Sequence, residues 1–138
     1  MKKINLKIKP KDLKTVVKIV FINKENKVLF LKRSKKIKKY PGEWDLPGGH
    51  LQVGEENNLI AALKREVKEE TKITLNYVPK KLSSLENIHF YYQKQDLSKY
   101  NIKIDPAEHT DIKFFSEGEL DPKEKFQKIA LDALEKVK

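Results

Sequence analysis

The chain has 138 residues, 30 of them Lys or Arg and 20 Asp or Glu, which gives a formal net charge of +10 at pH 7. It contains no cysteine, which excludes a disulfide framework and a thiolate metal site. No segment reaches the roughly 20 apolar residues of a membrane-spanning helix, and the first residues lack the continuous apolar run of a signal peptide. We therefore expect a single domain over residues 1–138, soluble, cytoplasmic and without a membrane partner.

The excess of positive charge would attract polyanions, whether a nucleotide, RNA or DNA. Its specificity is low, because the lysines are spread along the whole chain and no aromatic-interleaved RNA-binding signature is present. We expect a nucleotide-type small molecule as the main partner and keep RNA as a possible partner. The sequence leaves both a monomer and a homodimer open.

The first half of the chain begins with strand patterns. Apolar residues alternate over residues 3–9, which predicts an edge strand. The apolar, β-branched run 16–22 predicts a buried strand, and the polar turn 23–27 joins it to a hairpin partner at 28–32. The basic loop 33–39 follows, and it is either solvated or in contact with phosphates.

Residues 40–50 are rich in Pro and Gly, and paired glycines let backbone amides approach an anion or a metal-bound oxygen. After them we predict a helix of about fifteen residues that ends near Thr71. Its apolar side, adjacent to its acidic side, consists of Leu59, Ile60, Leu63 and Val67.

In the second half of the chain we predict a short strand at 74–78 and a hairpin of 81–86 with 88–95. We expect the polar segment 96–106 to form a loop over the cleft. A strand at 112–115 and an amphipathic helix at 122–137 follow, and we assign that helix to core packing alone.

Strand 88–95 carries four consecutive aromatic or imidazole side chains. Phe90 and Tyr92 fall on one face, and His89 and Tyr91 on the other. One face could line a base-binding pocket, although ordinary core packing is the commoner role of strand aromatics.

The segment 65–70, Arg-Glu-Val-Lys-Glu-Glu, places three carboxylates and a guanidinium within two helical turns. Glu66, Glu69 and Glu70 share an arc of roughly 100°, and like charges so spaced repel one another. A hard divalent cation such as Mg²⁺ or Mn²⁺ would supply the counter-charge. The alternative is a solvated charged face that Lys64 and Lys68 neutralise.

These residues resemble the Nudix hydrolase family, whose box reads Gly-x5-Glu-x7-Arg-Glu-U-x-Glu-Glu-x-Gly-U, with U an aliphatic residue. The resemblance extends to the flanking Trp44–Gly49 run and to Glu108-His109 before Phe114. Nine residues separate Glu55 from Arg65 where the family has seven, and Lys72 stands in place of the last glycine. The box positions that match are Gly49, Glu55, Arg65, Glu66, Val67, Glu69, Glu70 and Ile73.

The resemblance implies roles for individual residues. Glu66, Glu69, Glu70 and the backbone carbonyl of Gly49 would bind the metal. Arg65 would orient a glutamate by a charge-assisted bond. The residues expected in catalysis are Arg65, Glu69 and Glu108, with His109 as the second candidate after Glu108. The residues expected to contact the substrate are Arg33, Trp44 and Tyr92. Glu55 would support the site, if the two extra residues before Arg65 leave it in place.

The resemblance also implies the fold and the reaction. We expect an α/β/α sandwich around a central mixed β-sheet. With Mg²⁺ or Mn²⁺ the protein would split a nucleoside diphosphate linked to a moiety X into a nucleoside monophosphate and phosphorylated X. The alternatives are an RNA 5′-end pyrophosphohydrolase or binder, and a nucleotide-sensing Nudix domain without turnover.

Overall fold

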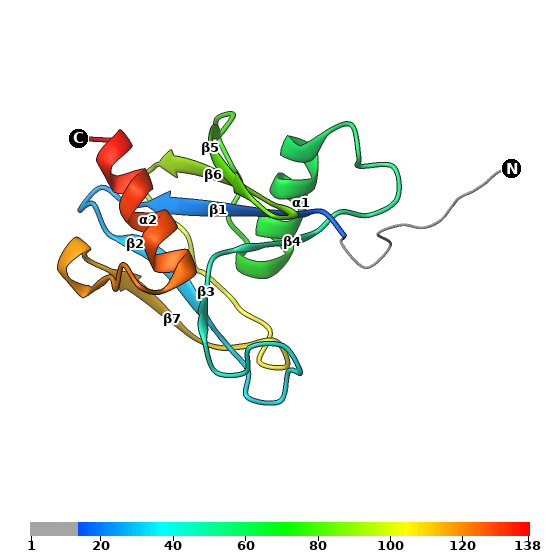
Figure 1. The fold of residues 1–138 in the computed structure, drawn as a ribbon, viewed down its shortest axis with the longest axis horizontal. Coiled ribbons are helices and arrows are strands. Elements are labelled where there is room, and N and C mark those ends of the chain that lie inside the picture. Colours follow the sequence, from blue (N-terminus) through cyan, green and yellow to red (C-terminus); the bar gives the residue numbers. More distant parts are fainter. Residues whose placement is uncertain (1–13) are drawn as a thin grey trace, which may run out of the picture.

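The computed structural model describes residues 14–138, so the strand expected at 3–9 lies outside the described residues. Figure 1 shows a twisted sheet with one helix on each face. The sheet has seven strands in the order β3-β2-β1-β6-β5, with β4 beside β1 and β7 beside β2. The elements are β1 Val16–Ile22, β2 Val28–Arg33, β3 Trp44–Asp45, β4 Gly48–His50, α1 Leu59–Thr71, β5 Lys80–Leu85, β6 Ile88–Lys94, β7 His109–Phe115, a 3-10 turn Glu117–Glu119 and α2 Lys125–Lys136.

The sheet is mixed, because β1 and β6 run parallel while the other paired strands are antiparallel. Strand β1 is apolar on both faces and lies at the centre of the sheet. Val17, Ile19 and Phe21 pack into the core under α1, whereas Val20 and Ile22 pack into the core under α2. This arrangement confirms the predicted α/β/α sandwich and its central mixed sheet. Within residues 14–138, no helix has the length and apolar character needed to cross a membrane.

Strands β1 and β2 form the expected hairpin, but they pair only at its closed end, where Ile22 faces Val28. Beyond that point the two strands diverge. Strand β3 then pairs with β2, and β4 pairs with β1. The Pro-Gly-rich segment 44–50 therefore lies in the gap of a splayed sheet, and this gap places its backbone beside α1.

The prediction of a strand at 74–78 is wrong. Within the described part of the chain this segment pairs with no strand. Of its apolar residues, Leu75 packs into the core under α1, while Tyr77 and Val78 are exposed. The carbonyl of Thr74 accepts a hydrogen bond from the Tyr100 hydroxyl at 3.0 Å, so the segment is held by a side chain rather than by a ladder.

The loop at 96–106 also differs from expectation. Leu97, Tyr100 and Ile102 pack against the core beside α1, so most of the segment covers that core rather than the cleft. Only Asp105 of this loop lines the cavity described below.

Strand β7 begins at His109, three residues before the predicted start at 112. Its pairing with β2 continues through an irregularity at Lys32/Arg33, so that Arg33 faces His109. The predicted hairpin of 81–86 with 88–95 is confirmed as β5 and β6, and the last predicted helix is confirmed as α2.

Helix α1 ends at a left-handed residue. Lys72 has φ 68° and ψ 13°, and its backbone N–H donates to the carbonyl of Lys68. The Nudix pattern has glycine at this position. A residue with a Cβ is strained in this left-handed backbone conformation.

We predict that Lys72→Gly raises the free energy of unfolding by up to about 1 kcal/mol, because glycine adopts positive φ without steric strain. Urea unfolding of the purified protein measures the change. Lys64→Gly, at an exposed position inside the same helix, is the matched control and should destabilise by about 1 kcal/mol. Destabilisation by both variants would contradict strain at Lys72.

Candidate active site

Helix α1 presents the acidic side chains to a cavity of about 830 Å³. Asn58 caps the helix, since its side chain accepts a hydrogen bond from the backbone N–H of Ala61 at 3.0 Å. The adjacent side of the helix is fixed by burial of Ala62, Leu63 and Val67. The three acids that the sequence placed on one face all line the cavity: Glu66, Glu69 and Glu70.

The turn at Gly48 and Gly49 packs directly against these acids. The backbone N–H of Gly48 donates to Glu70 Oε1 at 2.9 Å. Gly48 has φ 141°, and a Cβ there would collide with the carbonyl of Val17 in β1. A Cβ on Gly49 would collide with the carboxylate of Glu66. Glycine is therefore required at position 48 for the backbone to reach the carboxylates, whereas a side chain at position 49 would displace the carboxylate of Glu66.

The side chain of Arg65 binds three of the glutamate carboxylates. It contacts Glu55 through Nε at 2.7 Å and Nη2 at 2.9 Å, and its Nη1 lies 3.1 Å from both Glu66 and Glu69. Its Nη2 also donates to the carbonyl of His50 at 3.2 Å. Neither Arg65 nor Glu55 lines the cavity, so this network holds the acids from the outside.

The structure brings Glu55 to Arg65 although nine residues separate them in the sequence. The extra residues lie in the turns before α1, where Glu55 Oε1 also accepts a bond from the backbone N–H of Gln52 at 2.7 Å. The bond from Arg65 lowers the pKa of Glu55 to about 2, so this carboxylate is ionised at neutral pH. The same interaction raises the pKa of Arg65.

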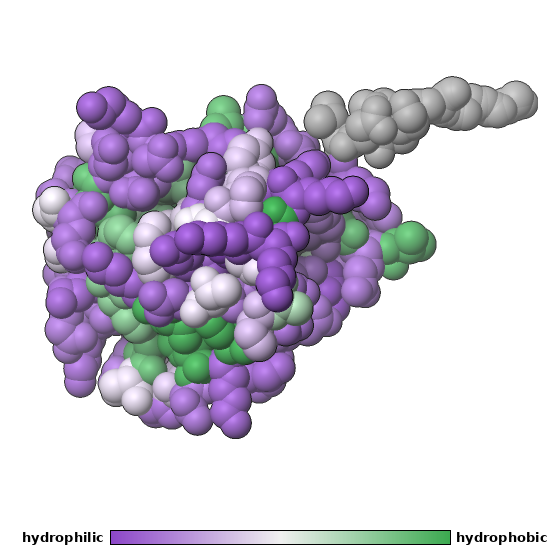
Figure 2. All heavy atoms as spheres, turned by 90° about the horizontal axis from the view of Figure 1, so that it is seen from below, coloured by the Kyte–Doolittle hydropathy of each residue, from purple (hydrophilic) through white to green (hydrophobic). Residues whose placement is uncertain are grey.

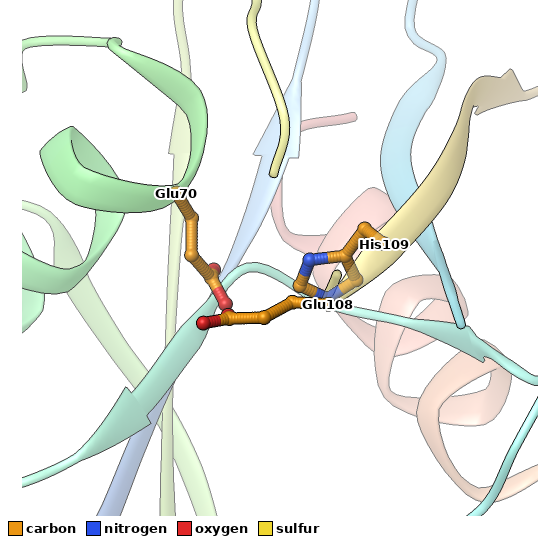
Figure 3. A group of neighbouring side chains, drawn as sticks. All are labelled: Glu70, Glu108 and His109. Carbon is orange, nitrogen blue, oxygen red and sulfur yellow. The ribbon is translucent and has the colours of Figure 1, made fainter. Parts of the chain in front are cut away.

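A second group of side chains approaches from the start of β7. Figure 3 shows the carboxylates of Glu70 and Glu108 pointing toward each other from opposite sides, with the His109 ring close by. One ligand atom from each of these three residues lies within 4.8 Å of the others. The position of Glu108 is fixed because its carbonyl accepts a hydrogen bond from the backbone N–H of Ser34 at 2.8 Å.

The electrostatics of this group favour a bound cation. Burial raises the pKa of Glu70 to about 8, against the lowering effect of the bond from Gly48. Burial also raises the pKa of Glu66, with Arg65 opposing the shift. Burial lowers the pKa of His109, which leaves a neutral imidazole at pH 7. Buried carboxylates with too little counter-charge and a neutral imidazole are donors that a divalent cation accepts, so the residues present fit a metal.

Sequence reasoning missed a buried charged network on the neighbouring wall. Lys18 Nζ lies 3.0 Å from Asp45 Oδ1 and donates to the carbonyl of Leu46 at 3.1 Å. Arg33 Nη1 lies 3.0 Å from the other oxygen of Asp45. A signal was available, because Lys18 is the single charged residue within the apolar run of β1.

The far wall of the cavity is formed by the first turn of α2 and the turn between β5 and β6. Assigning α2 to core packing alone is therefore wrong: residues before and at the helix start face the cavity. Arg33 and Trp44, expected at the substrate, line the cavity, whereas Tyr92 packs into the core under α2. The residues of the far wall are Glu86, Asn87, Ile88, Glu124, Lys125, Phe126 and Gln127.

Comparison with known proteins gives matches at three levels. The sequence model of the NUDIX domain matches residues 12–136. A curated protein of Xenopus laevis, m7GpppN-mRNA hydrolase NUDT17, is 42% identical over 67 residues, which are 49% of this chain and 21% of that protein. The chain thus matches about a fifth of the length of this relative.

Solved structures share the fold at low sequence identity. The MutT protein of Methanosarcina mazei superposes with a TM-score of 0.68 at 22% identity, covering 91% of this chain and 95% of that one. The NUDIX domain of Shewanella oneidensis NrtR, solved with ADP ribose, gives 0.71 at 19% identity, covering 95% and 94%.

We predict that Glu70→Gln removes a pH dependence of stability from the metal-free protein. An acid whose pKa is raised by folding stabilises most when protonated, so its contribution is lost as the pH rises from about 4.5 to about 8. In EDTA, the free energy of unfolding of the wild type should fall relative to Glu70→Gln by up to about 1.4 kcal/mol per pH unit over that range. Parallel urea-unfolding profiles would contradict the burial of this carboxyl.

We predict that Arg65→Lys weakens Mn²⁺ binding by about 10-fold or more, because a single ammonium cannot replace the guanidinium bonds to several carboxylates. Isothermal titration calorimetry measures the affinity, and circular dichroism verifies the fold. Lys64→Arg, an exposed change on the same helix, serves as the control. Unchanged Mn²⁺ affinity in Arg65→Lys would show that the arginine does not organise the acids.

Proposed function

We propose that this chain, which belongs to the Nudix family, is a hydrolase of pyrophosphate bonds that splits a nucleoside diphosphate linked to a moiety X. The products would be a nucleoside monophosphate and phosphorylated X. We propose that residues 1–138 work as a single domain, with Mg²⁺ or Mn²⁺ as the cofactor.

One observation carries this proposal. The acids of α1, the Gly48–Gly49 turn and Glu108, just before β7, come together in one cavity. A pyrophosphate bound there would meet the cation that these carboxylates hold, while the nucleoside could extend toward the far wall. We assign Glu66, Glu69, Glu70, Glu108 and the carbonyl of Gly49 to the metal, with His109 as a further donor.

The protein's own residues would prepare the site before substrate arrives. The Gly48 N–H fixes one oxygen of Glu70, and Arg65 fixes Glu66 and Glu69. A divalent cation, when bound, supplies positive charge that neutralises phosphate oxygens and makes a nearby water more acidic. Fixed carboxylates need little rearrangement during the reaction, which is how preorganised groups accelerate phosphoryl transfer.

We propose Glu69 as the group that accepts the proton from the attacking water. Its side chain is 57% exposed, the most accessible of the acids around Arg65. Only its Oε1 contacts Arg65, so Oε2 is free to face a water. Glu70 is already engaged by Gly48 and is more buried, which suits a role in binding.

An RNA 5′ end is the second candidate substrate. The similarity of 67 residues to an m7GpppN-mRNA hydrolase and the net charge of +10 support it. Binding to RNA through phosphate contacts would weaken steeply with salt. A nucleotide-sensing domain without turnover is the remaining alternative, and the substrate experiment distinguishes it.

We predict metal-dependent cleavage of a phosphoanhydride bond in at least one member of a substrate panel, which releases a nucleoside monophosphate from a nucleotide and pyrophosphate from a 5′-triphosphorylated RNA. The panel comprises nucleoside triphosphates, dinucleoside polyphosphates, nucleotide sugars and 5′-triphosphorylated RNA, each with Mg²⁺ and with Mn²⁺. Glu69→Gln and Glu70→Gln should each lower kcat by about 100-fold or more, since each removes a carboxylate from the reacting centre.

Glu25→Gln is the matched control, because Glu25 is exposed in the turn between β1 and β2 and its side chain makes no hydrogen bond or ion pair within residues 14–138. It should keep wild-type activity. If the wild type cleaves no substrate with either metal, the hydrolase proposal is overturned and a binding role without turnover takes its place.

A further inference from the structure

The loop between β2 and β3 carries a cluster of positive charge that the proposed reaction does not use. We call its four lysines, Lys35, Lys36, Lys38 and Lys39, the basic rim. All four are exposed, and none forms an ion pair with any residue among 14–138. Figure 2 shows hydrophilic side chains covering most of the face on which this loop lies.

One lysine of the basic rim, Lys39, lines the cavity, and the other three lie on the same loop. Ile37, Lys39 and Tyr40 of this loop line the cavity together with Glu108 and the acids of α1. The loop thus brings a lysine to a cavity that these carboxylates also line. Any anion that is held at the carboxylates by a cation, and that is long enough to reach this loop, would meet the rim.

The backbone of the loop is held in a defined shape. Arg33 Nε donates to the carbonyl of Lys39 at 2.9 Å, and the N–H of Gly42 donates to the carbonyl of Arg33 at 3.1 Å. The N–H of Ser34 donates to the carbonyl of Glu108, which ties the loop to the start of β7. The guanidinium of Arg33 is itself paired with Asp45, so the exposed lysines, and not Arg33, provide the unpaired charge.

Resting on the function proposed above, we propose that the basic rim binds phosphates beyond the cleaved bond, so that the preferred substrate carries three or more phosphates in a chain. Ammonium groups act on phosphate as compact point charges, and clustered charges of one sign at an opening attract a multiply charged ligand most strongly. A nucleotide sugar with two phosphates would gain little binding affinity from the rim, because both of its phosphates would lie at the carboxylates. The chain of phosphates could belong to a free polyphosphorylated nucleotide or to the 5′ end of an RNA.

The test compares a rim variant with a matched control. The rim variant is Lys36→Gln/Lys38→Gln/Lys39→Gln, and the control is Lys94→Gln/Lys103→Gln/Lys136→Gln, three exposed lysines that do not line the cavity. The measured quantity is the ratio of kcat/KM for a dinucleoside tetraphosphate to kcat/KM for ADP-ribose. We expect the rim variant to lower this ratio by about 10-fold, chiefly through KM, and the control to leave it unchanged.

A binding experiment separates this inference from the proposed function. Inorganic tripolyphosphate and pyrophosphate are titrated into the wild type and both variants at several salt concentrations, each with Mn²⁺ present. We expect the rim variant to lose affinity for tripolyphosphate more than for pyrophosphate, even if no substrate is hydrolysed. Equal losses for both ligands, or a loss that the control shares, would overturn the role of the rim.

The two sources of the phosphate chain are distinguished with RNA. Two short RNAs of one sequence, with a 5′-triphosphate or a 5′-monophosphate, are bound to the same proteins. A loss confined to the triphosphate RNA supports recognition of a phosphate chain at an RNA end. An equal loss for both RNAs means that the lysines bind the RNA backbone, which overturns the proposal.

Discussion

The constraint on which the structure depends is the repulsion among carboxylates gathered at one partly buried place. Glu66, Glu70 and Glu108 face a common cavity, and burial raises the pKa of both Glu66 and Glu70. Charges can be kept there only if fixed dipoles, a neighbouring cation or a bound ion oppose them. The protein supplies the first two, through the Gly48 amide and the Arg65 guanidinium. What remains uncompensated is the charge that a metal would neutralise.

The splayed sheet is what lets a backbone amide reach these carboxylates. If β1 and β2 paired along their whole length, their ladder would fill the gap that segment 44–50 occupies. Divergence after Ile22–Val28 leaves donors and acceptors on both strands unpaired, and β3 and β4 satisfy them. The Gly48–Gly49 turn is thus held by sheet hydrogen bonds on one side and by the acids of α1 on the other. Helix and sheet hold the site jointly.

Sequence reasoning succeeded where the relevant spacing was local. The acids of α1 and the hairpin of β5 with β6 follow from helix and strand periodicity, because a few residues determine which side chains share a face. The contact between Glu55 and Arg65 depends on the path of the turns before α1, which no spacing rule specifies. The error at 74–78 has a similar origin: apolar residues such as Leu75 indicate that a segment packs on the core, but they do not show whether a strand lies beside it. Lys18 was visible in the sequence, yet its pairing with Asp45 requires the splayed sheet.

The functional meaning of the net charge of +10 depends on where the charged residues lie, and not on its size. Lysines occur throughout the chain, and several are balanced by nearby acids, as Lys113 is by Glu119. The acids of α1 and Glu108 line the same cavity as Lys39 of the basic rim. This arrangement would orient a ligand that carries both a cation and a chain of phosphates, because the carboxylates attract the cation and the rim attracts free phosphate. The carboxylates alone would hold the cation but repel the free phosphates, and the basic rim alone would bind the phosphates without placing the pyrophosphate bond. Together, the carboxylates and the basic rim would set the orientation in which the ligand enters the cavity.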